Sequence, residues 1–249
     1  DESLRPSTLE DQHALARLVE NLENVHFFQC PVACNDVPKE ESTVNSFYAA
    51  LSGTTKNVQE AATDPDAVSD VIEMASLIAG GTAALHDRPF ISFVTSCMIS
   101  PLRLDCGAAN CLERMLEAEI LVAVSCAPVT GLSAPATLAG LLTLAHAEQL
   151  FAISLAQAIA PGARVLYGIV PGVANMWNMG FLGGAIEAGM MNAAAVLLAR
   201  RVGVPIFSDA GGADAKLPDI QAGYEKALSI LQVALSGGDY IHHSAGMLD

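Results

Sequence analysis

Polar side chains that could do chemistry follow two apolar stretches in the last quarter of the chain. Residues 204–207 lead into a loop of small and acidic residues, and Tyr240-Ile241 leads into His242-His243. Imidazole and carboxylate groups supply general acids and bases, metal ligands and partners for cations. Enzymes built on parallel strands carry such groups at the carboxyl ends of the strands. We therefore expect a functional site where these two stretches end.

The adjacent histidines are candidate catalytic residues. Successive residues of a strand face opposite sides, so one imidazole of His242-His243 is expected to face the mouth of the site and the other to lie behind it. The alternative is one buried structural histidine and one exposed histidine. Two adjacent histidines are a weak metal signal, because ligands usually come from one face of a strand, and we predict no metal.

The loop at residues 208–216 offers further candidates. Its Gly211-Gly212 pair permits a tight or left-handed turn at the end of the strand. From that loop Asp209 and Asp214 are candidate catalytic residues, and Lys216 is a candidate substrate-binding residue. Phosphate binding is disfavoured, because the aspartates would repel an anion. An ordinary connection between a strand and a helix is the alternative.

Aromatic residues make up only 5% of the chain, yet several fall where the mouth of a site is expected. Phe28, Tyr167 and Trp177 lie near predicted strand ends or in the loop that follows. Aromatic ring faces bind quaternary ammonium groups without hydrogen bonds, so these three are candidate substrate-binding walls. Glu187, in the next predicted helix, is a further substrate-binding candidate. Plain core packing is the alternative for the phenylalanine.

The elements that must position these residues alternate regularly along the chain. Strand-like apolar stretches begin near residues 25, 57, 90, 121, 165, 204 and 239. Helical patterns cover residues 8–21, 42–51, 64–79, 106–119, 136–160, 181–202 and 219–236. Such alternation is typical of βαβ units and a parallel sheet.

The number and rhythm of the strands predict an α/β fold, a (β/α)8 TIM barrel with about seven of its eight βα units in this chain. A doubly wound sheet is the alternative, although no GxGxxG turn follows any predicted strand. We interpret residues 1–249 as a single barrel domain that is truncated at both ends, with the eighth strand expected before residue 8.

Composition limits the classes of partner. The formal net charge is −15 and the sequence pI about 4.6, which disfavours nucleic acid and is compatible with cationic small molecules. Hydrophobic residues make up 52% of the chain, enough for one large core. The most apolar region, residues 134–160, contains His146, Glu148, Gln149 and Gln157, so no membrane span is expected.

The six cysteines form no CxxC pair, and no signal peptide is evident, so we expect reduced thiols and a cytoplasmic location. Cys97 or Cys126 as a nucleophile would need a partner base that the sequence does not indicate. Cys30 and Cys34 are spaced like half of a zinc site, which by itself is a weak signal.

Several segments in one order resemble a known family. Among them are RPSTLEDQHALARLVENLENVHF at residues 5–27, FISFVTSCMISPLRLD at 90–105, the long run at 134–168, ADAKLPDIQAGYEKALS at 213–229 and YIHHSAGML at 240–248. Together they span nearly the whole chain and resemble the trimethylamine methyltransferases, including the members without pyrrolysine that act on glycine betaine and related quaternary amines.

The resemblance implies a (β/α)8 barrel and a corrinoid-dependent methyl transfer. A methyl group would leave a quaternary or tertiary amine and go to Co(I) of a separate corrinoid protein, with no cofactor bound tightly by this chain. Because the chain shows only standard residues where the archaeal enzymes carry pyrrolysine, a betaine-like substrate is favoured over trimethylamine. A homo-oligomer is also expected.

Two other functions stay open from the residues alone. One is a metal-assisted lyase or hydrolase on a barrel, which would use His242, His243 and Asp209. The other is a non-catalytic subunit that binds a cationic osmolyte.

Overall fold

The computed structural model of the protein describes residues 5–244. The chain divides into two compact units: a first unit of Asp1–Thr95 with Asn110–Val122, and a second unit of Ser96–Ala109 with Ala123–Asp249. The last part of the predicted terminal loop, Ala245-Gly246, lies outside the described residues.

All seven predicted main strands are present. They are β1 (Phe27–Gln29), β2 (Asn57–Ala61), β3 (Ile91–Thr95), β6 (Val122–Cys126), β8 (Val165–Ile169), β11 (Ile206–Asp209) and β12 (Tyr240–His242). They form one sheet in the order β1-β2-β3-β6-β8-β11-β12, and the pairs β1–β2, β2–β3, β8–β11 and β11–β12 are parallel. A doubly wound sheet would reverse its order at a switch point. The sequential order excludes that alternative and agrees with the predicted barrel class.

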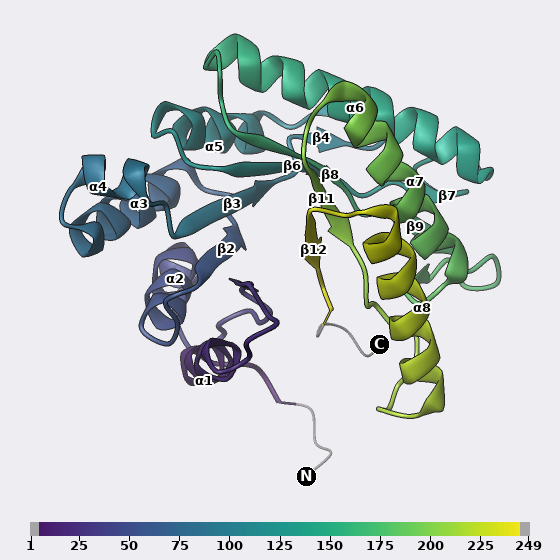
Figure 1. Cartoon of the computed structure of the whole chain (residues 1–249), viewed down its shortest axis with the longest axis horizontal. Coiled ribbons are helices and arrows are strands. Elements are labelled where there is room, and N and C mark those ends of the chain that lie inside the picture. Colours follow the sequence, from purple (N-terminus) through teal and green to yellow (C-terminus); the bar gives the residue numbers. More distant parts are fainter. Residues whose placement is uncertain (1–4, 245–249) are drawn as a thin grey trace. The chain divides into compact units, whose positions relative to one another are not determined.

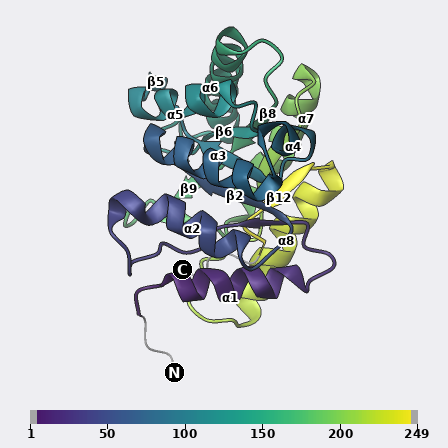
Figure 2. The same cartoon turned by 90° about the vertical axis from the view of Figure 1, so that its left-hand side faces the viewer.

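In the first unit, three helices match the predicted segments to within about one residue at each end. They are α1 (Leu9–Glu20), α2 (Ser42–Leu51) and α3 (Pro65–Ala79), which lie side by side in Figure 2. Local signals fix their ends. Thr8 and Asp11 form a capping box at α1, Asp64 caps α3, and Gly80 ends α3 in a left-handed conformation with φ of 86°.

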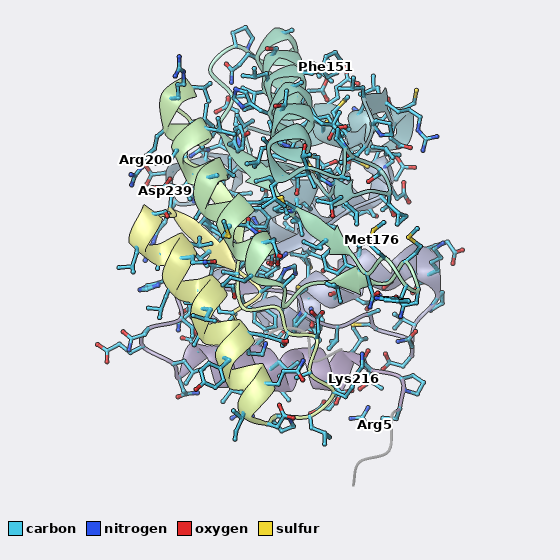
Figure 3. The ribbon with its side chains drawn as sticks, turned by 90° about the vertical axis from the view of Figure 1, so that its right-hand side faces the viewer. Arg5, Phe151, Met176, Arg200, Lys216 and Asp239 are labelled. Carbon is cyan, nitrogen blue, oxygen red and sulfur yellow. The ribbon has the colours of Figure 1, made fainter. Side chains whose placement is uncertain are left out.

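In the second unit, three long helices accompany strands β8, β11 and β12. Figure 1 shows α6 (Leu138–Ile159), α7 (Ile186–Val202) and α8 (Ile220–Ser236) gathered around these strands. The Asp219 side chain accepts a hydrogen bond from the backbone N–H of Ala222, as expected for a residue that begins a helix. The helices α7 and α8 pack against each other along their lengths, and Figure 3 shows them from the side.

The predicted helix over residues 181–202 is wrong at its start. Phe181–Leu182 forms strand β10, which pairs antiparallel with β9 (Gly172–Ala174), and α7 begins only at Ile186. A Cβ at Gly184 would lie 2.6 Å from Oε2 of Glu225 and 2.8 Å from the backbone N of Asp214. The glycines between strand and helix therefore serve close packing against the 209–225 region, which a helical pattern does not reveal.

Apart from α5, the remaining elements are short. They are the 3-10 helix η1 (Lys39–Glu41), α4 (Thr82–Asp87), α5 (Cys106–Glu117), the antiparallel pair β4 (Met98–Ile99) and β5 (Arg103–Leu104), and β7 (Val129–Thr130), which pairs with β9. Of these elements only α5 was predicted, and its predicted end at residue 119 lies two residues beyond the observed end at Glu117. The others carry too few residues for periodicity to reveal them.

Helix α6 is long and apolar enough, by length and composition alone, to cross a membrane. The core helix of a globular protein passes the same test. In this structure Leu141, Ala145 and Ala152 pack into the core of the second unit, and the polar side chains Glu148 and Gln149 are also buried. Glu148 accepts hydrogen bonds from Ser100 Oγ at 2.7 Å and from the Leu102 backbone N at 2.8 Å.

The first unit contains a partly buried glutamate, Glu60, with one buried carboxyl oxygen. Burial raises the pKa of Glu60 to about 7, and hydrogen bonds with Ser46 and Cys30 offset only part of this effect. The Oε2 atom of Glu60 has no hydrogen-bond partner among the described residues. The same surroundings raise the pKa of the Cys30 thiol, so the group is protonated at neutral pH.

We expect Gly168→Ala to destabilise the second unit by about 1–3 kcal/mol, the usual range for overpacking. A Cβ at this position in β8 would lie 2.6 Å from the Val124 carbonyl oxygen and 3.1 Å from Ser125 Cα, both backbone atoms. Thermal and urea unfolding measure the effect. The control is Gly223→Ala in α8, where a Cβ meets nothing within 4 Å and replacing an exposed helical glycine stabilises by up to about 1 kcal/mol. Equal changes in the two variants would contradict the packing argument.

We expect Glu60→Gln to stabilise the protein more at pH 8 than at pH 5. Folding raises the pKa of Glu60 from 4.5 to about 7, so the native state binds more protons than the unfolded chain between these values. The stability of the parent protein therefore falls as pH rises through this window, and the glutamine variant lacks that loss. Urea midpoints at both pH values test this, with exposed Glu113→Gln as control. A pH-independent difference between parent and variant would refute it.

Candidate functional site

The carboxyl ends of β11 and β12 bring three polar residues together. The parallel register places Asp209 beside His242, and the ligand atoms of Asp209, His242 and His243 all lie within 4.8 Å of one another. We call these three residues the Asp-His-His cluster. Two loops that lie about 30 residues apart in sequence thus meet at one edge of the sheet, as the strand-end argument predicted.

His242 is almost completely buried, with 2% of its surface exposed. Its ring stacks on Phe207 with centroids 3.7 Å apart and an angle of 10° between the planes. Burial lowers the pKa of His242 to about 3, so the imidazole is neutral at physiological pH. Neither ring nitrogen has a hydrogen-bond partner among the described residues. A buried imidazole without partners is unusual and calls for a ligand or another group that satisfies it.

His243 lies past the end of β12 and departs from the strand alternation expected from the sequence. Its φ of 64° turns the backbone into the left-handed region, and its ring lies against that of His242 with centroids 4.5 Å apart. Nδ1 of His243 lies 2.6 Å from Oδ1 of Asp209, and the side chain is 36% exposed. The expectation that the two imidazoles face opposite sides is therefore wrong, because the strand ends between them.

A side chain of α7 fixes the backbone of Asp209. Asn192 Oδ1 accepts hydrogen bonds from the Asp209 backbone N at 3.2 Å and from Ser208 Oγ at 3.1 Å, and Asn192 Nδ2 donates to the Ala188 carbonyl. Asn192 is 1% exposed. Asn192 was not among the residues predicted from the sequence, although an asparagine on a helix rich in buried alanine is a signal for such a residue.

The loop after Asp209 is fastened to α8 by polar side chains. Ser229 Oγ accepts from the Gly211 backbone N at 3.1 Å, and Lys226 Nζ donates to the Gly211 carbonyl at 2.5 Å. Gly211 has a φ of 97°, and a Cβ there would lie 2.7 Å from Ser244 Cα, so glycine is required where the two loops touch. The predicted role of Gly211 in a left-handed turn is confirmed.

Glu225 fixes the second half of the same loop. Its Oε2 accepts from the backbone N of Asp214 at 2.8 Å and of Ala215 at 3.3 Å. The Asp214 carboxylate in turn accepts from the Gly183 backbone N at 2.9 Å. Lys216 follows as an exposed residue, and Figure 3 shows it at the end of α8 away from Asp239. The carboxylate of Asp214 is thus part of the loop framework rather than of the Asp-His-His cluster.

The predicted aromatic walls do not join the cluster. Tyr167 is fully buried and lies in register with Ile206. It is therefore on the same face of the sheet as Ser208, whose hydroxyl contacts α7. The Tyr167 hydroxyl lies 3.0 Å from His146 Nδ1 on α6. Trp177 is 98% exposed in the turn between β9 and β10.

Two other predicted substrate-binding residues belong to other elements. Phe28 belongs to the first unit and is buried in register with Val58. Glu187 is exposed in the first turn of α7. The aromatic ring that does border the cluster is Phe207, within the strand that the sequence identified.

The buried cysteines are poorly suited to act as nucleophiles. Burial raises the pKa of the Cys97 thiol and raises that of Cys126 well above that of a free thiol, which leaves the unreactive protonated form at neutral pH. Burial likewise raises the pKa of Cys30 and Cys34. The chemistry available at the cluster is therefore that of a carboxylate and two imidazoles: holding a proton, opposing a positive charge or binding a cation.

Comparison with known proteins identifies relatives along the whole chain. It is 32% identical to the glycine betaine methyltransferase of Desulfitobacterium hafniense strain Y51, over all of this chain and 52% of that protein. It is 31% identical to the trimethylamine methyltransferase of Methanosarcina thermophila, over 98% of this chain and 50% of that protein. The chain spans about half the length of these relatives.

Solved structures with the same fold are more distant in sequence. Dihydropteroate synthase from Xanthomonas albilineans matches with a TM-score of 0.54 at 14% identity, over 97% of this chain and 81% of that one. The Thermus thermophilus enzyme gives a TM-score of 0.51 at 11% identity, over 94% and 82%. These neighbours are TIM barrels, which confirms the predicted fold class.

The family model described as trimethylamine methyltransferase (MTTB) matches residues 1–249. The match extends over every element that builds the Asp-His-His cluster, from Phe207 in β11 to His243 after β12. The chain belongs to the trimethylamine methyltransferase family.

Proposed function

We propose that this chain takes part in transferring a methyl group from a quaternary or tertiary amine to Co(I) of a corrinoid carried by a separate protein. The observation that carries the proposal is the family match over the whole chain, with relatives named for methyl transfer from trimethylamine and glycine betaine. Membership of this family makes an amine methyltransferase the expected class of enzyme.

The chemistry of the described residues supports an external methyl acceptor. The Co(I) of a corrinoid would supply the nucleophile, so the chain needs none of its own. Cys97 and Cys126 are buried thiols with raised pKa values, and the cluster offers imidazole and carboxylate instead. The tasks left to this chain are to bind the amine, exclude water and orient the N-methyl group.

The charges on the loop favour a zwitterionic substrate of the betaine class. Asp209 presents a carboxylate that opposes a methylammonium group, and Lys216 in the same loop is a cationic partner for a carboxylate. Protonated trimethylamine carries only the positive charge and would not use the lysine. The overall charge of −15 also raises the local concentration of cationic ligands. A homo-oligomer in the cytoplasm is part of the same proposal.

A calorimetric titration with glycine betaine, proline betaine, carnitine and trimethylamine tests the substrate class. We expect one betaine to bind at least about tenfold more tightly than trimethylamine, which corresponds to about 1.4 kcal/mol. Demethylation of that betaine in the presence of a Co(I) corrinoid protein then tests the reaction. Binding without methyl transfer would favour the non-catalytic osmolyte-binding function. Preference for trimethylamine would refute the betaine assignment.

Glu225→Ala tests whether the loop must be held in place for binding. Because two backbone N–H groups of the loop lose their acceptor, we expect the KM for the betaine to rise about tenfold, or about 1.4 kcal/mol, with a smaller change in kcat. Glu225→Gln keeps one side-chain oxygen as acceptor and should recover most of the loss. Exposed Glu113→Ala is the control and should behave like the parent. A lack of recovery in Glu225→Gln would contradict a positioning role.

A further inference from the structure

We propose that the Asp-His-His cluster is a binding site for a divalent transition-metal ion, with Zn²⁺ as the first candidate. Two imidazoles and one carboxylate are a ligand set that zinc enzymes use at sites that keep one position open for a substrate. No metal is expected from the sequence, because adjacent strand residues face opposite sides. The turn at His243, with φ of 64°, removes that objection by returning its ring to the cluster.

His242 supplies an observation that is independent of the clustering. The side chain is 2% exposed, both ring nitrogens are unpartnered among the described residues, and one of them belongs to the group of atoms within 4.8 Å. A buried imidazole without hydrogen-bond partners is destabilising, and a metal ion would satisfy it. Its stacking on Phe207, with ring centroids 3.7 Å apart, fixes the plane of the ring.

The remaining geometry requires only local adjustment. Zinc bonds of about 2.0–2.2 Å in a tetrahedral site place ligand atoms roughly 3.4 Å apart. The contact of 2.6 Å between His243 Nδ1 and Asp209 Oδ1 must open, and the most distant pair of ligand atoms must close. The His243 side chain is 36% exposed and can move.

Lys226 limits the strength of the site. Its ammonium group is held on the Gly211 carbonyl and interacts electrostatically with Asp209. Because the Lys226 ammonium group already lies near the Asp209 carboxylate, it repels a bound metal ion. The expected metal affinity is therefore lower than in a zinc site without such a neighbour. This charge also distinguishes the cluster from an acidic patch that attracts any cation.

The role of the metal in methyl transfer rests on the proposed function. When the N–CH₃ bond of a betaine breaks, the methyl group goes to Co(I) and the electron pair stays on nitrogen. The departing amino acid then has an amine nitrogen and a carboxylate oxygen that can bind one metal ion in a five-membered ring. The quaternary substrate can bind through its carboxylate alone. Such a site would therefore hold the departing amine more strongly than the substrate.

The test is Zn²⁺ and Co²⁺ binding to the full-length chain without an affinity tag, after treatment with a chelator. We expect one equivalent of either ion, measured by calorimetry and elemental analysis. The Co²⁺ absorption spectrum should show nitrogen and oxygen ligands without thiolate charge-transfer bands, which excludes the cysteines as ligands. Asp209→Asn and His243→Asn should each weaken binding on the order of 100-fold. His13→Asn, a histidine outside the cluster, should bind like the parent.

Circular dichroism and thermal unfolding show whether each variant is folded. Because the His243 side chain is partly exposed, His243→Asn keeps the test valid if variants of buried residues fail to fold. No stoichiometric metal in the parent, or equal binding in Asp209→Asn and the parent, would overturn the proposal. Thiolate bands in the Co²⁺ spectrum would overturn it as well. Methyl transfer by metal-free protein at the full rate would show that the metal has no role in the reaction, and it would leave the methyltransferase function intact. Stoichiometric binding without any demethylation would leave the metal site and remove the function.

Discussion

The site depends on the parallel pairing of β11 with β12. That register sets Asp209 beside His242, and no local sequence signal joins these residues across more than 30 positions. The side chains of α7 and α8 then hold the ends of the strands. Asn192 fixes the backbone of Asp209, and Ser229 and Lys226 fix Gly211. Because the same helices pack on the strands, the core of the second unit and the geometry of the cluster are maintained by one set of contacts.

The electrostatics of the cluster follow from burial more than from the net charge of the protein. His242 is neutral because desolvation disfavours its charged form, despite the opposing effect of Asp209. An unpartnered neutral imidazole beside a carboxylate is a poor stabilising arrangement, and stable cores normally satisfy such groups. Functional sites tolerate this kind of local conflict because binding or catalysis resolves it. Glu60 in the first unit is another ionisable group with a raised pKa, but Ser46 and Cys30 form hydrogen bonds with it that favour its charged form.

Much of the fold could be predicted because its signals are local. The strand at β2 and the helix α2 lie at the residues expected from the alternation of apolar stretches, and Asp64 and Gly80 mark the ends of α3. The short strands β9 and β10 could not be predicted, because two or three residues show no periodicity. The start of α7 was misplaced for a different reason. Gly184 is required by the approach of Glu225, a contact between residues 41 positions apart.

The sequence by itself determined the order of strands and helices, the barrel class and the presence of aspartate and histidine at the ends of β11 and β12. These follow from periodicity, capping residues and the rule that parallel strands carry function at their carboxyl ends. Only the tertiary structure decided which groups meet. The positive φ of His243 turns its ring toward Asp209, while the register of β8 directs Tyr167 toward the helices. Side-chain direction at a strand end depends on backbone geometry and on packing by distant helices, and neither is encoded in the spacing of residues.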